Sequence, residues 1–170
     1  MQAKFLARCA IFSALMCICA WISIPAGNLI FTLQSFAFLL ALFVLGGKGA
    51  FVATAVYLLL GMVGLPVFSG FRGGFGMLLG VTGGYLWGFL LASLLFWGIT
   101  AIFGEKSKIC AAIAASLSVY ICGAVWFSVY ASGGLIPVLL QGVLPYLLPD
   151  AVKFILAFSL SGRLKKVLSA

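Results

Sequence analysis

Apolar runs follow one another along this chain, and short breaks rich in glycine, proline or charge separate them. A helix that crosses the bilayer core needs about 20 such residues. The chain has 170 residues, which leaves room for about six spans with short connections and for no soluble domain. We therefore expect one domain, residues 1–170, that is all-α and an integral membrane protein. Its six transmembrane helices are predicted at Phe5–Ile24, Phe31–Leu45, Ala50–Val63, Gly84–Phe103, Ile109–Ala131 and Pro145–Leu160.

The stretch between the third and fourth predicted helices is apolar but unsuited to a regular helix. Pro66 precedes Gly70, Gly73, Gly74 and Gly76. An interior helical position costs roughly 1 kcal/mol when it is glycine and about 3 kcal/mol when it is proline. Irregular backbone beside a bilayer is tolerated only where it is buried in protein or lines a cavity. We expect a glycine-rich outer loop that folds over or into a binding site.

Charge and composition agree with a membrane protein. The chain is 65% hydrophobic and 7% charged, whereas soluble domains carry about 25% charged residues. Its net charge of +8 would suggest nucleic acid in a soluble protein, but eight of the ten basic residues fall at one set of predicted helix ends. Positive loops stay in the cytoplasm. We expect a cell-membrane protein with both termini cytoplasmic, no nucleic-acid partner, and Asn28, the Gly70–Gly76 loop and Gly133–Gly134 outside.

The residues needed for catalysis or metal binding are mostly missing. The chain has no histidine, and its only acids are Glu105 and Asp150. The five cysteines lie in apolar runs without a CxxC pair, which is typical of small packing residues. No GxxxxGK[ST] motif is present, so ATP hydrolysis by that route is excluded. We expect no enzyme activity, no cofactor and no metal site.

One ionisable pair, Asp150 with Lys153, falls within a predicted span. Residues three apart share a helix face, and charges within spans usually face a cavity or a partner. The pair is either part of a ligand site or a structural ion pair. Thr32 and Gln34 are polar residues near the same outer face, and Gln34 offers the donor and acceptor that suit an amide or a urea. The alternatives are a helix N-cap for Thr32 and an inter-helix hydrogen bond for Gln34.

Three residues in or beside the glycine-rich stretch are further candidates for a ligand site. Tyr85 either stacks on or hydrogen-bonds a ligand, or anchors the membrane interface as Trp87 is expected to do. Phe68 supplies an apolar wall. Arg72, the one basic residue at the outer ends, either attracts a carboxylate or is a solvated loop residue.

The first predicted helix carries small residues at a spacing of four, as in Ala3 with Ala7 and Ala10 with Ala14. This spacing lets two helices approach closely. The approaching helix belongs either to the same bundle or to another subunit.

These motifs together resemble the BioY family. The segments that carry the resemblance are GLPVFSG at 64–70, LLGVTGGY at 78–85, FTLQ at 31–34 and the pair of Asp150 and Lys153. BioY proteins are the substrate-binding membrane subunits (S components) of the energy-coupling-factor (ECF) biotin transporters. The resemblance covers the whole chain in length, layout and motif order. The chain departs from the family pattern at Ile30 and Val81, where proline is expected.

The resemblance implies high-affinity capture of biotin at an outward site that the loops after the first and third helices close. It places Gln34, Tyr85, Asp150 and Lys153 at binding positions. Asp150 or Gln34 would accept the ureido N–H groups of biotin, and Lys153 or Arg72 would meet a polar end of the molecule.

The resemblance also implies partners in the membrane and the cytoplasm. These are a transmembrane coupling subunit, which would dock on the small-residue face at Ala10 and Ala14, and two cytoplasmic ATPase subunits. Two alternatives remain for transport: an S component for thiamin or riboflavin, and a stand-alone secondary transporter that uses Asp150 as its proton site. An intramembrane enzyme and a purely structural subunit are weaker alternatives.

Overall fold

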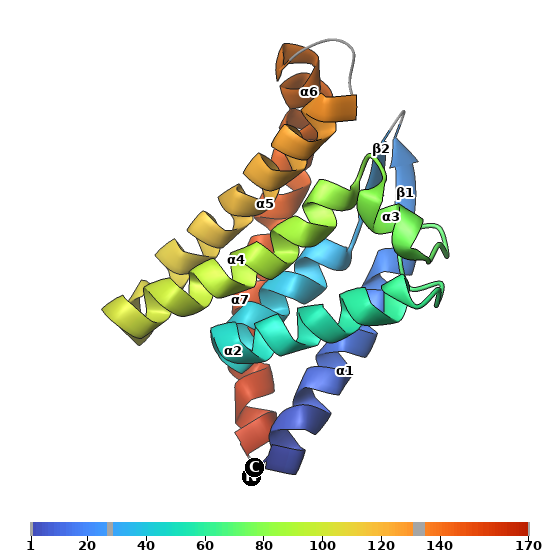
Figure 1. Ribbon diagram of the computed structural model, residues 1–170. Coiled ribbons are helices and arrows are strands. Elements are labelled where there is room, and N and C mark those ends of the chain that lie inside the picture. The colour runs from blue at the N-terminus through green and yellow to red at the C-terminus, as the bar shows by residue number, and fades with distance from the viewer. Residues whose placement is uncertain (1, 27–28, 131–134, 170) are drawn as a thin grey trace.

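The computed structural model describes residues 2–26, 29–130 and 135–169 and is mainly helical (Figure 1). Five of its helices, counted over these residues, are long and apolar enough to cross a membrane. The elements in chain order are α1 (Gln2–Trp21), β1 (Ser23–Ala26), β2 (Leu29–Thr32), α2 (Gln34–Met62), α3 (Phe75–Leu79), α4 (Gly83–Phe103), the 3-10 helix η1 (Glu105–Ser107), α5 (Lys108–Tyr130), α6 (Leu135–Gly142) and α7 (Leu144–Ser169).

Helix α2 contains the second and third predicted helices. The break expected at Gly46–Gly47 is present, but it is a kink without a loop. Gly46 has φ 74° and ψ 176°, a left-handed conformation that glycine adopts without steric cost. The two halves of α2 meet at a sharp angle beside α4 (Figure 1). The described chain therefore has six long helical segments, as predicted, in five helices, because α2 contributes two of them.

The prediction is wrong between the first two helices. Helix α1 ends at Trp21 rather than Ile24, and α2 begins at Gln34 rather than Phe31. The intervening residues form an antiparallel hairpin of β1 and β2, in which Ser23 lies opposite Thr32. The segment is rich in isoleucine and contains a proline, which suits strand pairing and disfavours a continued helix. The fold is thus helical with one small hairpin, and Asn28 lies outside the described residues.

Three further boundaries differ from the prediction. The glycine-rich stretch contains the short helix α3, and the connection expected at Ser132–Leu140 contains α6. Helix α7 runs from Leu144 to Ser169, so the expected basic tail is helical and Pro149 lies inside a helix. Pro149 is the sixth residue of α7 and lies past its first turn, so it removes one backbone hydrogen bond, the one that would run to the Pro145 carbonyl. Gly133–Gly134 lies outside the described residues.

The two ends of the chain meet at one end of the molecule, where α1 begins and α7 finishes (Figure 1). The guanidinium of Arg8 donates a hydrogen bond to the backbone carbonyl of Leu168. An even number of membrane crossings would place the two ends on the same side.

Helices α4 and α5 pack closely because glycines lie at their contact. A Cβ atom on Gly84 would be 2.2 Å from Cβ of Trp126, and one on Gly123 would be 2.2 Å from Cε1 of Tyr85. Small residues at helix contacts allow such an approach in a membrane, where no hydrophobic effect drives helices together. This contact fixes the position of the Tyr85 ring.

Replacing Gly123 with leucine is expected to destabilise the fold by about 1 to 3 kcal/mol. The new side chain overlaps the Tyr85 ring, so α4 and α5 must separate. Gly98→Leu is a matched control, because nothing lies within 4 Å of a Cβ at Gly98. Thermal unfolding of both variants in detergent measures the difference. Equal midpoints would show that α4 and α5 do not depend on this contact.

Candidate functional site

A cavity of about 830 Å³ lies between α2, α4, α5 and α7. Its wall is mainly aromatic and aliphatic, with polar side chains at a few places. Residue Thr32 of β2 and residues of the 68–82 segment line it as well, so the hairpin and the glycine-rich stretch lie at one end of the cavity. The volume falls in the range of about 300 to 1,000 Å³ that is usual for small-molecule sites.

Seven residues predicted from the sequence as ligand-binding candidates line this one cavity. They come from four separate segments: the end of β2 with the start of α2, the glycine-rich stretch, the start of α4 and the first part of α7. The seven are Thr32, Gln34, Phe68, Arg72, Tyr85, Asp150 and Lys153.

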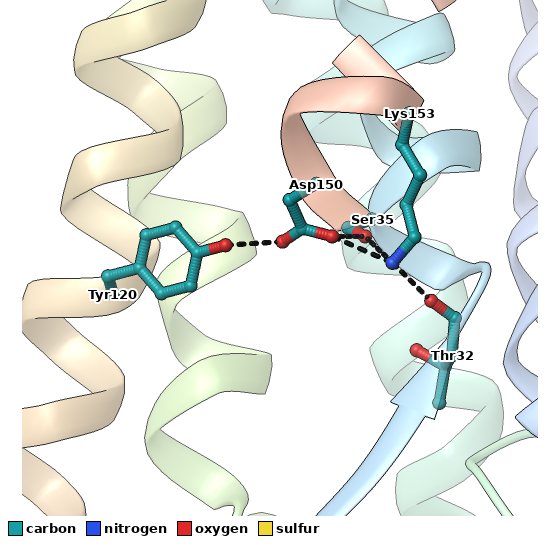
Figure 2. Close-up of polar contacts among 5 residues, drawn as sticks. All are labelled: Thr32, Ser35, Tyr120, Asp150 and Lys153. Carbon is teal, nitrogen blue, oxygen red and sulfur yellow. Dashed lines mark hydrogen bonds and ion pairs between the residues drawn. The ribbon is translucent and has the colours of Figure 1, made fainter. Parts of the chain in front are cut away.

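Asp150 and Lys153 form an ion pair in the wall of the cavity (Figure 2). Lys153 Nζ lies 2.7 Å from Asp150 Oδ1 and also donates to the Thr32 carbonyl at 2.8 Å and to Ser35 Oγ at 3.0 Å. Only 9% of the Lys153 surface is exposed. The pair is therefore an ion pair that lines the cavity, and its part in a ligand site stays a prediction.

Two partners of Asp150 were missed by the sequence analysis. Tyr120 of α5 donates a hydrogen bond to Asp150 Oδ2, and Ser35 Oγ donates to Asp150 Oδ1 at 2.9 Å (Figure 2). The carboxylate thus joins α2, α5 and α7 through three donors. Ser35 directly follows Gln34, a predicted site residue, and this position could have marked it as a candidate. Tyr120 had no such signal in the sequence, because tyrosine in a span commonly serves as a packing residue.

Gln34 is 5% exposed, and its Nε2 atom has no hydrogen-bond acceptor among the described residues. The inter-helix hydrogen bond considered for this side chain is therefore not made by the amide nitrogen. A buried N–H group without a partner costs about 1 to 3 kcal/mol. Because Gln34 lines the cavity, an acceptor on a ligand would satisfy it.

Thr32 does not cap α2. The N-cap position is Leu33, and no side chain caps the helix. Thr32 instead ends β2 and supplies the backbone carbonyl that holds Lys153. The N-cap interpretation is wrong, and the contribution of Thr32 to the site is through its main chain.

Tyr85, Phe68 and Arg72 occupy different parts of the wall. The Tyr85 hydroxyl donates to the Gly142 carbonyl at 2.9 Å, so it ties α4 to the end of α6. Phe68 is 1% exposed and lies edge-on to Tyr57, with ring centroids 5.5 Å apart. Arg72 is exposed, and its backbone carbonyl accepts a bond from the Phe68 N–H.

Trp21, at the end of α1, contacts the segment that connects α2 to α3 at two places. Its indole N–H donates to the Pro66 carbonyl at 2.7 Å, and its ring stacks on Phe71 with centroids 5.1 Å apart. Phe71 has φ 55° and is the one non-glycine residue with positive φ among those the structure describes. These two contacts hold the beginning of the glycine-rich stretch against the end of α1.

Ala10 and Ala14 lie on the exposed side of α1, together with Ala3 and Ala7. The opposite side of the helix packs on α2 and buries residues such as Met16. The small-residue face therefore does not serve packing inside the described bundle. It remains open to another protein or to lipid.

Comparison with known proteins agrees with this architecture. The family model described as "BioY family" matches residues 1–170. The chain is 36% identical to "Biotin transporter BioY" of Thermotoga maritima, over 95% of this chain and 96% of that protein. It is also 36% identical to "Probable biotin transporter BioY" of Pyrococcus horikoshii, over 97% and 98% of the two chains.

A solved structure has the same fold. It is a crystal structure of the S-component for biotin from an ECF-type ABC transporter, and it superposes with a TM-score of 0.88 at 25% sequence identity. The match covers 97% of this chain and 92% of that chain. Full-length agreement in the family model, in two relatives and in this structure leads to one conclusion: the chain belongs to the BioY family.

Proposed function

We propose that this chain is a biotin S component, which captures biotin at the outer face of the cytoplasmic membrane and takes part in its uptake through an ECF-type ABC transporter. The single observation that carries the proposal is the cavity, in which an apolar wall surrounds the polar group of Asp150, Lys153 and Gln34. Its relatives are named biotin transporters, and the family is one of transport proteins rather than enzymes. Biotin is the transported substrate and not a cofactor.

The chemistry of the site suits biotin. Its ureido group offers two N–H donors and one carbonyl acceptor, which match the Asp150 carboxylate and the Gln34 amide nitrogen. Its bicyclic thioether ring is apolar and suits aromatic walls such as Phe68. Its carboxylate, at the other end of the molecule, needs a cation that is not already paired with Asp150, and Arg72 in the cavity wall provides one. A mostly apolar pocket with few placed polar groups is typical of small-ligand sites.

The orientation and the partners follow from the same proposal. Both termini lie in the cytoplasm because the basic residues gather at the helix ends on their side. The glycine-rich loop then lies outside and covers the entrance. A transmembrane coupling subunit docks on the exposed face of α1 that contains Ala10 and Ala14, and two cytoplasmic ATPases supply the energy.

Titration of biotin onto the purified, detergent-solubilised chain tests the proposal, with thiamin and riboflavin as controls. Selective, stoichiometric binding of biotin without other subunits is the expected result. Binding of thiamin or riboflavin instead of biotin would show that the chain is an S component for a different vitamin. Binding of none of the three by a folded sample would contradict the proposal and favour a secondary transporter or a structural subunit.

Replacing Tyr120 with phenylalanine is expected to weaken biotin binding about tenfold. The change removes one donor to the charged Asp150 oxygen, and a hydrogen bond to a charged group contributes about 1.5 to 3 kcal/mol. Tyr57→Phe is a matched control, because the Tyr57 hydroxyl is buried without a partner among the described residues. Calorimetric titration compares the two variants. Equal affinities would mean that Tyr120 does not orient the carboxylate.

A further inference from the structure

Basic residues dominate the end of the molecule where the chain begins and ends. Helix α1 starts there and lies beside the kink of α2, because the Cys9 thiol is 3.6 Å from the carbonyl oxygen of Gly49, just after the kink. Lys165 of α7 lies beside Lys108 of α5 and is also close to the carboxylate of Glu105 in η1. The basic residues carried by these segments are Lys4, Arg8, Lys48, Lys106, Lys108, Arg163, Lys165 and Lys166.

Carboxylates cannot balance these cations. The chain has two acidic side chains, and each is already in an ion pair: Glu105 with Lys108, and Asp150 with Lys153 in the distant cavity. No acidic side chain is left for Arg8. Like charges held together destabilise the folded state unless an anion from outside neutralises them.

A small groove lies within this basic end. It has a volume of about 80 Å³ and is lined by Arg8 of α1, Lys165 and Leu168 of α7, and Val44 and Leu45 of α2. Water occupies about 30 Å³ per molecule in the liquid, so the groove has room for a small anionic group. Its lining combines two cationic side chains with three aliphatic ones.

We propose that this groove binds the phosphate headgroup of an anionic phospholipid. The charge of the lining calls for an anion, and the neighbouring leucines and valine call for an apolar part beside it. A phospholipid at the membrane surface offers both, whereas free inorganic phosphate offers only the charge. Basic pockets between spanning helices bind anionic headgroups in this way. The site depends on neither the identity of the transported ligand nor the occupancy of the large cavity.

Native mass spectrometry of the full chain in neutral detergent tests the proposal, with phosphatidylglycerol and phosphatidylcholine as probes. The double variant Arg8→Gln with Lys165→Gln is expected to lose phosphatidylglycerol affinity by at least about tenfold, because each basic residue near an anionic surface contributes about fivefold. The matched control is Lys4→Gln with Lys48→Gln, which removes the same charge at the same end and outside the groove lining. This control is expected to lower the phosphatidylglycerol affinity by less than the Arg8→Gln, Lys165→Gln variant does.

Three outcomes would overturn the proposal. Equal losses in the two double variants would mean a diffuse attraction to positive charge without a site. Equal retention of phosphatidylcholine would remove the need for a negative headgroup, and displacement of the lipid by millimolar inorganic phosphate would identify the groove as a simple anion site. Arg8 also holds the Leu168 carbonyl, so Lys165→Gln alone, expected to lose about fivefold, keeps the test valid if the double variant unfolds.

Discussion

Replacing Asp150 with alanine is expected to weaken biotin binding at least tenfold. The carboxylate accepts hydrogen bonds from Lys153, Ser35 and Tyr120 in the cavity wall. Its removal takes away an acceptor for the ligand and leaves the buried ammonium of Lys153 without its counter-charge. Removing one partner of a buried ion pair costs about 3 to 5 kcal/mol, so the loss of stability must be measured beside the loss of affinity.

Calorimetric titration of biotin onto Asp150→Ala measures this effect. Glu105→Ala is the natural control, since Glu105 is the other acidic residue of the chain and lies exposed in the η1 turn. The control variant is expected to bind as the parent chain does. Unchanged affinity in a folded Asp150→Ala protein would remove Asp150 from the site.

A leucine at Ala10 or Ala14 is expected to leave biotin binding intact and to stop most ATP-driven uptake. Both alanines lie on the exposed side of α1, away from the cavity lining. Bulk added at a small-residue face prevents the close approach of a partner helix. Binding of biotin by the isolated chain needs no such approach, so the variants should keep their affinity for biotin and lose uptake.

Uptake of labelled biotin into cells that contain the coupling subunit and the ATPases is the measurement. Ala101→Leu, at an exposed alanine of α4, adds the same bulk to another exposed helix surface and is expected to transport normally. Normal uptake by the α1 variants would show that the coupling subunit docks elsewhere.

The sequence predicted the helices well wherever an apolar run of span length ended in a clear signal. The break at Gly46–Gly47 is an example, because Gly46 can adopt the positive φ that the kink requires. The hairpin of residues 23–32 was missed because its apolar residues continue the apolar pattern of α1. Periodicity cannot separate a short apolar strand from helix in such a run, and only pairing with its neighbour decides the outcome.

The cavity shows the same division between local and long-range information. Lys153 and Asp150 were recognisable because charges inside a span are costly and need a reason. Tyr120 was not recognisable, since its role depends on α5 crossing beside α7 at the level of Asp150. Gln34 was chosen for its donor and acceptor. Only the packed bundle shows that its amide nitrogen has no acceptor among the residues that the structure describes.

The contact of Trp21 with Pro66 and Phe71 has a consequence for the rate at which a ligand leaves. An opening of this end of the cavity in which the glycine-rich stretch moves away from α1 would break one hydrogen bond and one aromatic stack at the same time. Together these contribute roughly 1 to 2 kcal/mol, or about a five- to thirtyfold lower frequency of opening. Trp21 does not line the cavity, so we expect it to lengthen the residence time of a ligand that it does not touch.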